Sequence, residues 1–258
     1  MQHSRSVAAP RTVFALILRE VASTHGRSKG GYLWAVIEPV GGIALLTLVF
    51  SFAFRTPPLG DSFPLFYATG FLPFLMYQDV AQKLTTTLRF SKPLLFYPRV
   101  TFADALIARF LLGSLMQLAV SGVIILGILA TFRIGTFVDL PEIALAYAMA
   151  ASLGLGVGTL NCCLTSLFPL WERVWAIANR PLFLVSTIFF LFETVPPAYR
   201  AWLWFNPLAH VIGQMRKGFY PMYAGAFVSP LYVFGMASVM LAAGLMLLRR
   251  HHSAILND

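Results

Sequence analysis

Charged residues are the scarcest component of this sequence. Only 11% of its 258 residues are Asp, Glu, Lys or Arg, whereas soluble domains carry about 25%. Hydrophobic residues make up 58% of the chain, and its mean hydropathy is +0.75. Because a helix needs roughly 20 apolar residues to cross a bilayer, the length allows about six spans with short connections. The composition excludes a sizeable soluble domain and predicts an all-α integral membrane protein.

Acidic residues are especially few, because only 10 Asp and Glu accompany 19 Lys and Arg, for a net charge of +9. In a soluble protein this excess would suggest nucleic-acid binding, but no exposed basic domain exists to carry it. Basic residues that flank apolar spans instead hold them against an anionic inner leaflet. Most Lys and Arg residues fall on the side of the two termini, so we expect both termini in the cytoplasm.

The chain also lacks the usual catalytic, metal-binding and nucleotide-binding motifs. Its two cysteines, Cys162 and Cys163, are adjacent, so they are poorly placed to form a disulfide or share a metal. No Walker A motif occurs, and the patterns HExxH, CxxC, GxSxG and GxGxxG are absent. His210 has no evident nucleophile to serve. We therefore expect no catalytic residue, cofactor or metal ion in this chain.

Residues 1–33 predict an amphipathic interface helix on the cytoplasmic membrane surface. Phe14 and Leu18 fall on its apolar face, and Arg19 and Glu20 fall on its polar face. No small-residue cleavage site follows this short apolar run. We therefore expect the first true span to serve as its own uncleaved signal.

Six longer apolar segments follow, and together they predict one membrane domain over residues 34–258. The expected spans cover residues 34–54, 63–80, 102–132, 142–168, 175–192 and 228–248. Small residues recur at every fourth position of the fourth span. They are Ala146, Ala150, Gly154, Gly158 and Cys162. This pattern lets helices approach closely, so we expect the stripe to pack against neighbouring helices.

Glu38 and Pro39 allow two interpretations. Near the start of a helix, the helix dipole stabilises a carboxylate, and proline is tolerated in the first turn. Alternatively, Glu38 is a polar contact inside a pathway, because carboxylates within a membrane are costly. The sequence leaves both open.

Residues 81–99 form a basic segment without any acidic residue. Leu84 and Leu88 share one helical face, and we expect Pro93 to end this helix at Lys92. A short amphipathic helix between two spans is either a solvated surface or a docking surface for a partner.

Residues 193–227 are too polar and too interrupted by proline to cross a bilayer as one helix, yet too aromatic for an ordinary solvated loop. Non-helical backbone at membrane depth persists only where protein or a water-filled cavity covers it. We therefore expect external re-entrant half-helices that form the roof of a pathway. The residues that mark this segment are Trp202, Trp204, Asn206, Pro207, His210 and Arg216.

Three stretches resemble one family of membrane proteins. The run GYLWAVIEP at residues 31–39, preceded by Arg19-Glu20, resembles the entry to the first span of polysaccharide-exporting type 2 ABC transporter permeases. The run FNPLAH at residues 205–210, with Arg216 further on, resembles the segment before the last span of that family. The run DALIAR at residues 104–109 is similar to the start of the third helix in its capsule-export members. The resemblance covers essentially the whole chain.

This resemblance implies a homodimer of the chain, together with two cytoplasmic ATP-binding subunits that hold the ATP and Mg²⁺. It agrees with the missing Walker A motif. In the capsule subgroup the cargo is a lipid-linked acidic polysaccharide, which passes to a periplasmic adaptor and an outer-membrane channel. The resemblance thus implies a multi-pass permease of the bacterial inner membrane that contacts polysaccharide and lipid.

The same resemblance assigns candidate roles to individual residues. Contact with the ATP-binding subunits would involve Arg89, Lys92, Pro93, Glu172 and Arg173. Aromatic rings stack on the apolar faces of sugars, so the candidate channel lining is Trp34, Glu38, Phe66, Phe74, Tyr77, Trp171 and Trp175. Each of these aromatic residues can instead face lipid or pack internally. Arg216 and Lys217 either meet acidic sugars at the exit or anchor the membrane interface.

Rival functions remain open from the sequence. Within the same superfamily, the cargo is alternatively O-antigen, teichoic acid or a drug. A membrane-embedded enzyme acting on lipid-linked sugar predicts chemical conversion by the purified chain without ATP. A scaffold without transport activity predicts that no substrate is retained when the chain is lost.

Overall fold

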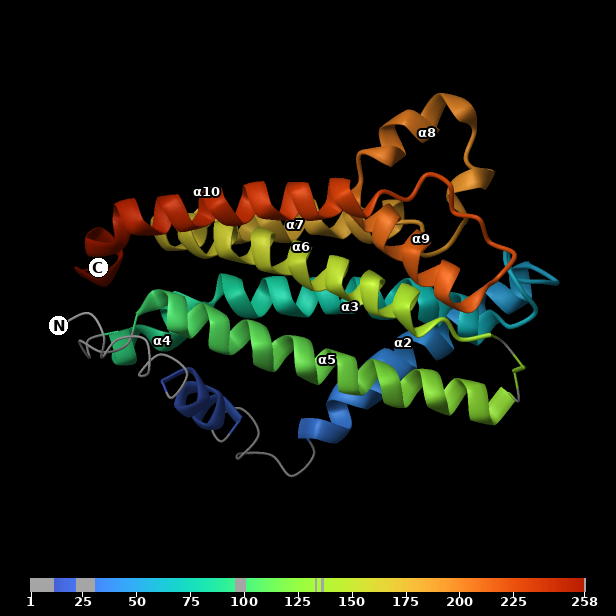
Figure 1. The fold of residues 1–258 in the computed structure, drawn as a ribbon, viewed down its shortest axis with the longest axis horizontal. Coiled ribbons are helices and arrows are strands. Elements are labelled where there is room, and N and C mark those ends of the chain that lie inside the picture. Colours follow the sequence, from blue (N-terminus) through green and yellow to red (C-terminus); the bar gives the residue numbers. More distant parts are fainter. Residues whose placement is uncertain (1–11, 22–30, 96–100, 133, 136, 258) are drawn as a thin grey trace.

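The structure, a computed structural model, describes residues 12–21, 31–95, 101–132, 134–135 and 137–257. Within these ranges all regular structure is helical, so the predicted all-α class is confirmed. The long helices run along the length of the molecule (Figure 1). The helix over residues 12–21, α4 and the end of α10 lie at one end, which we call the terminal end. Helices α8 and α9 lie at the opposite end, which we call the cap end.

Four of the described helices are long and apolar enough to cross a membrane. They are α2 (Gly31–Ala53), α5 (Phe102–Phe132), α6 (Leu140–Leu167) and α10 (Pro230–Asn257). They correspond to the expected first, third, fourth and sixth spans. Helices α3 (Phe63–Thr85) and α7 (Pro169–Val185) occupy the places of the other two. Neither is among these four: polar residues such as Asp79 and Lys83 lower the hydropathy of α3, and α7 has only 17 residues.

Local sequence explains where α3 and α6 begin. The side chain of Ser62 caps α3 by accepting a hydrogen bond of 3.4 Å from the backbone N–H three residues later, and Pro64 stands in the first turn. Asp139 caps α6 in the same way, with Pro141 in the first turn. A capping side chain accepts a hydrogen bond from a backbone N–H group that has no partner within the helix. Proline has no backbone N–H group, so it leaves no such donor unpaired in the first turn.

Helix α6 is the centre of the molecule and packs most extensively against α3 and α10. Its stripe of small residues is buried against α3, as expected. A Cβ atom added to Gly154 would lie 3.0 Å from the carbonyl oxygen of Tyr77, and one added to Gly158 would lie 2.7 Å from Cβ of Leu84. The predicted close packing is therefore confirmed, because larger side chains would separate the two helices.

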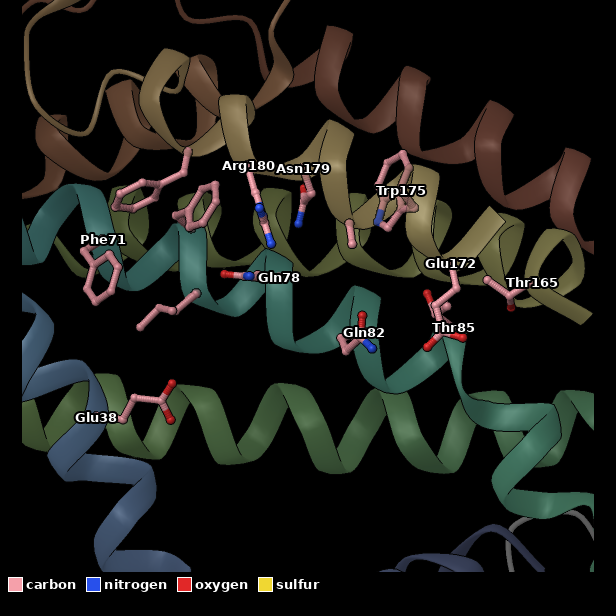
Figure 2. A pocket seen from close by; sticks show the side chains of 14 residues that line it. Glu38, Phe71, Gln78, Gln82, Thr85, Thr165, Glu172, Trp175, Asn179 and Arg180 are labelled. Atoms are coloured by element: carbon pink, nitrogen blue, oxygen red, sulfur yellow. The ribbon is translucent and has the colours of Figure 1, made fainter. Parts of the chain in front are cut away.

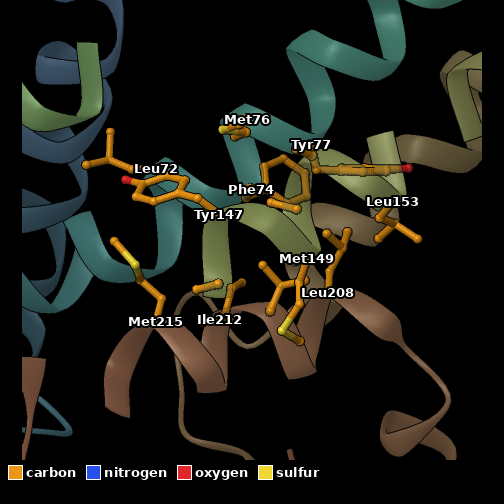
Figure 3. Close-up of a cluster of buried hydrophobic side chains, with 14 of the residues drawn as sticks. Leu72, Phe74, Met76, Tyr77, Tyr147, Met149, Leu153, Leu208, Ile212 and Met215 are labelled. Carbon is orange, nitrogen blue, oxygen red and sulfur yellow. The ribbon is translucent and has the colours of Figure 1, made fainter. Parts of the chain in front are cut away.

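Large apolar side chains fill the remaining space around α6 (Figure 3). Leu72 and Met76 come from α3, Met149 and Leu153 from α6, and Ile212 from α9. All of them are almost completely buried. In a lipid environment such contacts stabilise helix association through van der Waals packing rather than through removal of surface from water.

The expected fifth span is wrong at both ends. Helix α7 begins at Pro169 and ends at Val185 rather than at Phe192. Beyond it, Thr187 has a φ angle of 61°, which lies in the left-handed region and cannot continue a right-handed helix. The proline is compatible with the first helical position because it has no N–H to satisfy there.

The segment at residues 193–227 contains two short helices in place of a span. A 3₁₀ turn (Phe192–Thr194) precedes α8 (Pro197–Trp204) and α9 (Pro207–Phe219). Helix α9 packs against α6 and α3, whereas α8 projects beyond the bundle (Figure 1). The two helices lie at the same end as the α2–α3 and α5–α6 connections.

At the terminal end, α4 (Thr87–Leu95) follows α3 after the single residue Thr86. The prediction that Pro93 ends this helix at Lys92 is wrong, because α4 continues to Leu95. The interruption lies earlier, at Thr86, whose hydroxyl donates hydrogen bonds to the carbonyl oxygens of Gln82 and Lys83. Such side-chain bonds compete with the helical backbone pattern. The side chains of Lys92 and Pro93 lie outside the described residues.

Candidate functional site

An open cleft with a cavity volume of about 610 Å³ lies between α2, α3 and α7 (Figure 2). On α3, Phe71, Leu75, Gln78 and Gln82 recur at intervals of three and four residues, so they share the helix face that forms one wall. Helix α7, which has no buried residue, forms another wall. The cleft is lined by Glu38, Phe71, Phe74, Leu75, Gln78, Gln82, Thr85, Thr165, Glu172, Trp175, Ala176, Asn179, Arg180 and Phe183.

The cleft continues as a second space of about 460 Å³ between α2, α3 and α5. The two spaces share Glu38, Phe71, Leu75, Gln78, Gln82, Trp175 and Asn179. The second space adds Asp79, Lys83 and Gln117. Nζ of Lys83 lies 2.7 Å from a carboxylate oxygen of Asp79, so these two opposite charges are paired on the same helix.

Amide and aromatic side chains give the cleft its chemistry. Gln78, Gln82 and Asn179 each carry an amide that both donates and accepts hydrogen bonds. Trp175 and Phe183 present flat apolar rings between these polar groups. This combination suits an extended ligand that has many hydroxyl groups and apolar ring faces.

Four of the seven candidate lining residues lie at the cleft. Glu38, Phe74 and Trp175 line the first space, and Tyr77 lines the second. Tyr77 is only 2% exposed, so it offers little surface to a ligand. Glu38 is exposed and stands beyond the first turn of α2, which begins at Gly31. Its interpretation as a residue stabilised at a helix start is therefore wrong.

The other three candidate lining residues lie elsewhere. Trp34 is 64% exposed on α2 and does not line the cleft. The indole N–H of Trp171 donates a 2.9 Å hydrogen bond to Oδ1 of Asn161, which joins α7 to α6. Phe66 is fully buried, and its ring lies 4.3 Å from the guanidinium carbon of Arg216. Trp171 and Phe66 are covered by neighbours that helical position alone does not predict.

Sequence analysis missed several polar residues of the cleft. Gln78, Gln82, Asn179 and Arg180 all line it. Their signal was available, because polar side chains at helical spacing within apolar segments indicate a face turned away from lipid. The predicted lining consisted almost entirely of aromatic residues and therefore did not include these polar side chains.

At the terminal end, the two segments expected to contact ATP-binding subunits lie side by side. The guanidinium of Arg89 on α4 lies 3.2 Å from a carboxylate oxygen of Glu172, which lies in the first turn of α7. Arg173 is exposed next to it. Because Glu172 also lines the cleft, this exposed ion pair connects the surface helix α4 to the cleft wall.

The helix over residues 12–21 docks through a buried ion pair. Nε of Arg109 on α5 lies 2.9 Å from a carboxylate oxygen of Glu20. The same guanidinium donates a 3.2 Å hydrogen bond to the hydroxyl of Thr86 and lies 4.6 Å from the ring centre of Phe90. Glu20 is only 8% exposed, so the polar face of this helix packs against α5 at this position. The sequence of this helix alone does not show that Glu20 pairs with Arg109, because Arg109 lies on α5.

Asn206 organises the start of α9 at the cap end. Its Oδ1 accepts a 3.0 Å hydrogen bond from the N–H of Leu208, and Pro207 occupies the first helical position. Its Nδ2 donates a 3.2 Å hydrogen bond to the hydroxyl of Ser186, beyond α7. The Asn-Pro pair therefore joins the start of α9 to the end of α7.

His210 is held in one neutral form within the cap. Its Nδ1 accepts a hydrogen bond from the N–H of Ser229, and its Nε2 lies 2.7 Å from the carbonyl oxygen of Trp204, to which it donates. Burial lowers the pKa of His210 below its ordinary value. Both ring nitrogens are occupied, which leaves none free to act as a base. Trp202, by contrast, is 78% exposed on α8.

Arg216 is buried, with only 1% of its surface exposed. It donates hydrogen bonds of 3.0 and 3.1 Å to the carbonyl oxygens of Phe190 and Ile188. Both earlier interpretations, an exit contact for sugars and an interfacial anchor, required an exposed side chain and are therefore wrong for Arg216. The ammonium of Lys217 lies 3.8 Å from a carboxylate oxygen of Glu142.

The sequence of this chain also matches known proteins. Residues 11–220 match the family model described as ABC-2 type transporter. The chain is 30% identical to the polysialic acid transport protein KpsM of Escherichia coli, over 96% of each chain. It is 22% identical to the capsule polysaccharide export inner-membrane protein CtrC of Neisseria meningitidis serogroup A, over 95% of this chain and 92% of that protein. It is also 22% identical to the capsule polysaccharide export inner-membrane protein BexB of Haemophilus influenzae, over 81% and 79%.

The matched region includes α2, α3 and α7, the helices that enclose the first space of the cleft, together with α9 of the cap. It also includes the surface helix α4 and its ion-pair partner on α7. This chain therefore belongs to the ABC-2 type transporter family.

Proposed function

We propose that this chain is the permease subunit of an ATP-driven exporter that moves a lipid-linked capsular polysaccharide from the cytoplasm across the bacterial inner membrane. One structural observation carries the proposal: the cleft between α2, α3 and α7 combines amides and aromatic rings along its walls. Sugars offer hydroxyl groups to the amides and ring faces to the aromatic residues. Relatives named for capsule polysaccharide export support the same cargo.

In this proposal α3 and α7 also span the membrane, which makes six spans. At about 1.5 Å per residue, the 23 residues of α3 and the 17 residues of α7 approach or exceed the roughly 30 Å hydrocarbon core. Their polar residues Gln78, Gln82, Asn179 and Arg180 line the cleft. These helices therefore need fewer apolar residues than helices surrounded by lipid.

The proposed functional unit is a homodimer. The cleft is open along one side of the single chain, and α7 has no buried residue. A second copy related by twofold symmetry would close two such clefts into one channel, because identical surfaces can face each other in a symmetric dimer.

Two ATP-binding subunits would bind at the terminal end, which would face the cytoplasm together with both termini. Candidate contacts are the helix over residues 12–21, α4 with Arg89, Lys92 and Pro93, and the start of α7 with Glu172 and Arg173. The partner subunits would hold ATP and Mg²⁺. Movement of α4 would reach the cleft wall through the Arg89–Glu172 pair.

The cap end would face the periplasm. There, α8 and α9 would form the external re-entrant segment that covers the channel exit, with Trp202 exposed toward a periplasmic adaptor or the membrane interface. An outer-membrane channel would continue the route.

Deletion of the chain in its source cell tests this proposal. Loss of surface polysaccharide with accumulation of full-length lipid-linked polymer inside the cell is the expected result. Restoration of surface polymer by the wild-type chain is the matched control. A normal surface with normal internal pools would contradict polysaccharide export. A shortened or unmodified precursor inside the cell would favour an enzyme acting on lipid-linked sugar.

A further inference from the structure

Two charged side chains of the cleft lack an ion-pair partner among the residues that the structure describes. Glu38 on α2 and Arg180 on α7 both line the first space. The cation Lys83 of the adjoining space is instead paired with Asp79. Unpaired charges that face a cavity are candidates for ligand contact.

Both charges lie well inside their helices, where an unpaired charge in a membrane span carries a high free-energy cost. Arg180 stands about 16 Å from the start of α7, and Glu38 stands about 10 Å from the start of α2, at the usual rise per residue. If both helices span the membrane, as proposed above, both charges lie inside the bilayer. Charged side chains persist there when they face a water-filled cavity or bind a partner.

We infer that Arg180 selects a carboxylate-bearing sugar unit in the cleft, an inference that rests on the proposed function. Figure 2 shows Arg180 and Asn179 extending from α7 toward Gln78 on α3. A guanidinium binds a carboxylate through two parallel hydrogen bonds. The amides of Asn179 and Gln78 bind the neighbouring hydroxyl groups.

Aromatic residues on α7 frame this charged position. Trp175, Asn179 and Phe183 recur at intervals of four residues, so the same helix face presents a ring, an amide and a second ring. Arg180 follows directly after the amide. A polymer lying along α7 would therefore stack its rings on either side of the arginine.

Three other cations near the cleft or at the cap end already have partners. Arg216 is buried and bonded to backbone carbonyl oxygens. Lys217 and Lys83 each have a carboxylate within 3.8 Å and 2.7 Å, respectively. Glu38 carries the same sign of charge as an acidic sugar, so it weakens binding of such a ligand and its neutral substitute strengthens it.

The test uses the complex of this chain with its ATP-binding partner in lipid nanodiscs. The probes are an acidic oligosaccharide with one carboxylate per repeat and its carboxyl-reduced form of equal length. The wild-type complex should bind the acidic probe more tightly. Arg180→Gln should weaken that binding by about tenfold, because a hydrogen-bonded charge pair is lost. Arg180→Lys should retain part of the preference, since it keeps the charge but not the planar fork.

Two further variants make the result specific. Glu38→Gln should strengthen binding of the acidic probe by about twofold, because it removes a like charge at high effective dielectric. Arg249→Gln is the matched control, because Arg249 is exposed near the end of α10 and lines neither space of the cleft, so it should leave the preference unchanged. If Arg180→Gln does not assemble, the other two variants still test the inference. Arg180→Lys should weaken binding of the acidic probe, and Glu38→Gln should strengthen it.

Several outcomes overturn the inference. They are equal binding of both probes by the wild-type complex, binding of neither probe, an unchanged preference in Arg180→Gln, and equal losses in Arg249→Gln and Arg180→Gln. Failure of the proposed function is separate, because it appears as normal surface polymer in the deletion strain. If the wild-type chain restores export in the deletion strain but its complex binds both probes equally, only the inference about Arg180 is rejected, and the proposed function stands.

Discussion

Two buried arginines hold opposite ends of this molecule in different ways. At the terminal end, Arg109 is paired with a carboxylate, that of Glu20, on a separate helix. At the cap end, Arg216 bonds to two carbonyl oxygens of the irregular segment after α7 and stacks on Phe66. The first arginine has a partner of opposite charge within 2.9 Å, whereas the second donates hydrogen bonds to two uncharged backbone carbonyl oxygens.

This difference indicates different mechanical roles. An ion pair joins two elements at one point, and either element can be displaced when the charges separate and find water. Carbonyl oxygens belong to the backbone itself, so Arg216 fixes the path of the chain between α7 and α8. The terminal helix is thus held through one pair of side chains, and the irregular segment at the cap end is held through its backbone carbonyl oxygens.

Loss of Arg216 should have the largest effect on stability. Arg216→Ala leaves a cavity beside Phe66 and two unsatisfied carbonyl oxygens, so we expect about 3–4 kcal/mol lower free energy of unfolding. Thermal unfolding of the purified chain, followed by tryptophan fluorescence, measures this change. The adjacent Lys217→Ala is the control, with an expected cost within about 1 kcal/mol because its ion pair is partly exposed. Equal effects of the two variants would show that the cap is not held by Arg216.

Separation of the terminal ion pair should have the next largest effect. Glu20→Gln or Arg109→Gln leaves one buried charge without its partner, and we expect about 2–3 kcal/mol weaker docking of the helix over residues 12–21. Protease accessibility of that helix reports the change. The double variant should recover part of the loss, because it leaves no unpaired charge. No such recovery would mean that the helix is held by its apolar contacts alone.

Removal of the Asn206 cap should have an intermediate effect. Asn206→Ala loses the cap of α9 and the bond to Ser186, with an expected cost of about 1 kcal/mol. Asn206→Asp keeps the acceptor but not the donor, so its unfolding temperature should lie between those of the wild type and the alanine variant. An aspartate variant as unstable as the alanine variant would assign the effect to the Ser186 contact.

The exposed Arg89–Glu172 pair should have the smallest effect on stability. Arg89→Ala should change the free energy of unfolding by less than about 1 kcal/mol, because both side chains are open to solvent. The difference from the wild type should shrink further in high salt, where exposed charges are screened. A cost as large as that of Glu20→Gln would mean that the two ion pairs at the terminal end contribute similarly to stability.

Local patterns were sufficient for several features of the fold. The lack of charge predicted the helical membrane class, and the small residues from Ala146 to Cys162 predicted the face of α6 that packs on α3. Each depends on residues a few positions apart in one helix, and helical periodicity relates such residues directly. The same patterns failed at helix ends, as at Val185 and Thr86, where side-chain hydrogen bonds and backbone angles decide where a helix stops.

The sequence by itself determined which segments are helical and which faces of them are small, apolar or polar. Only the tertiary structure decided which of these faces meet. Glu20 and Arg109 are 89 positions apart, and Phe66 lies on a different helix from Arg216. Gln78 and Arg180 share a cleft although they belong to α3 and α7. Periodicity orders side chains around one helix axis, but the packing of separate helices sets the distance between them.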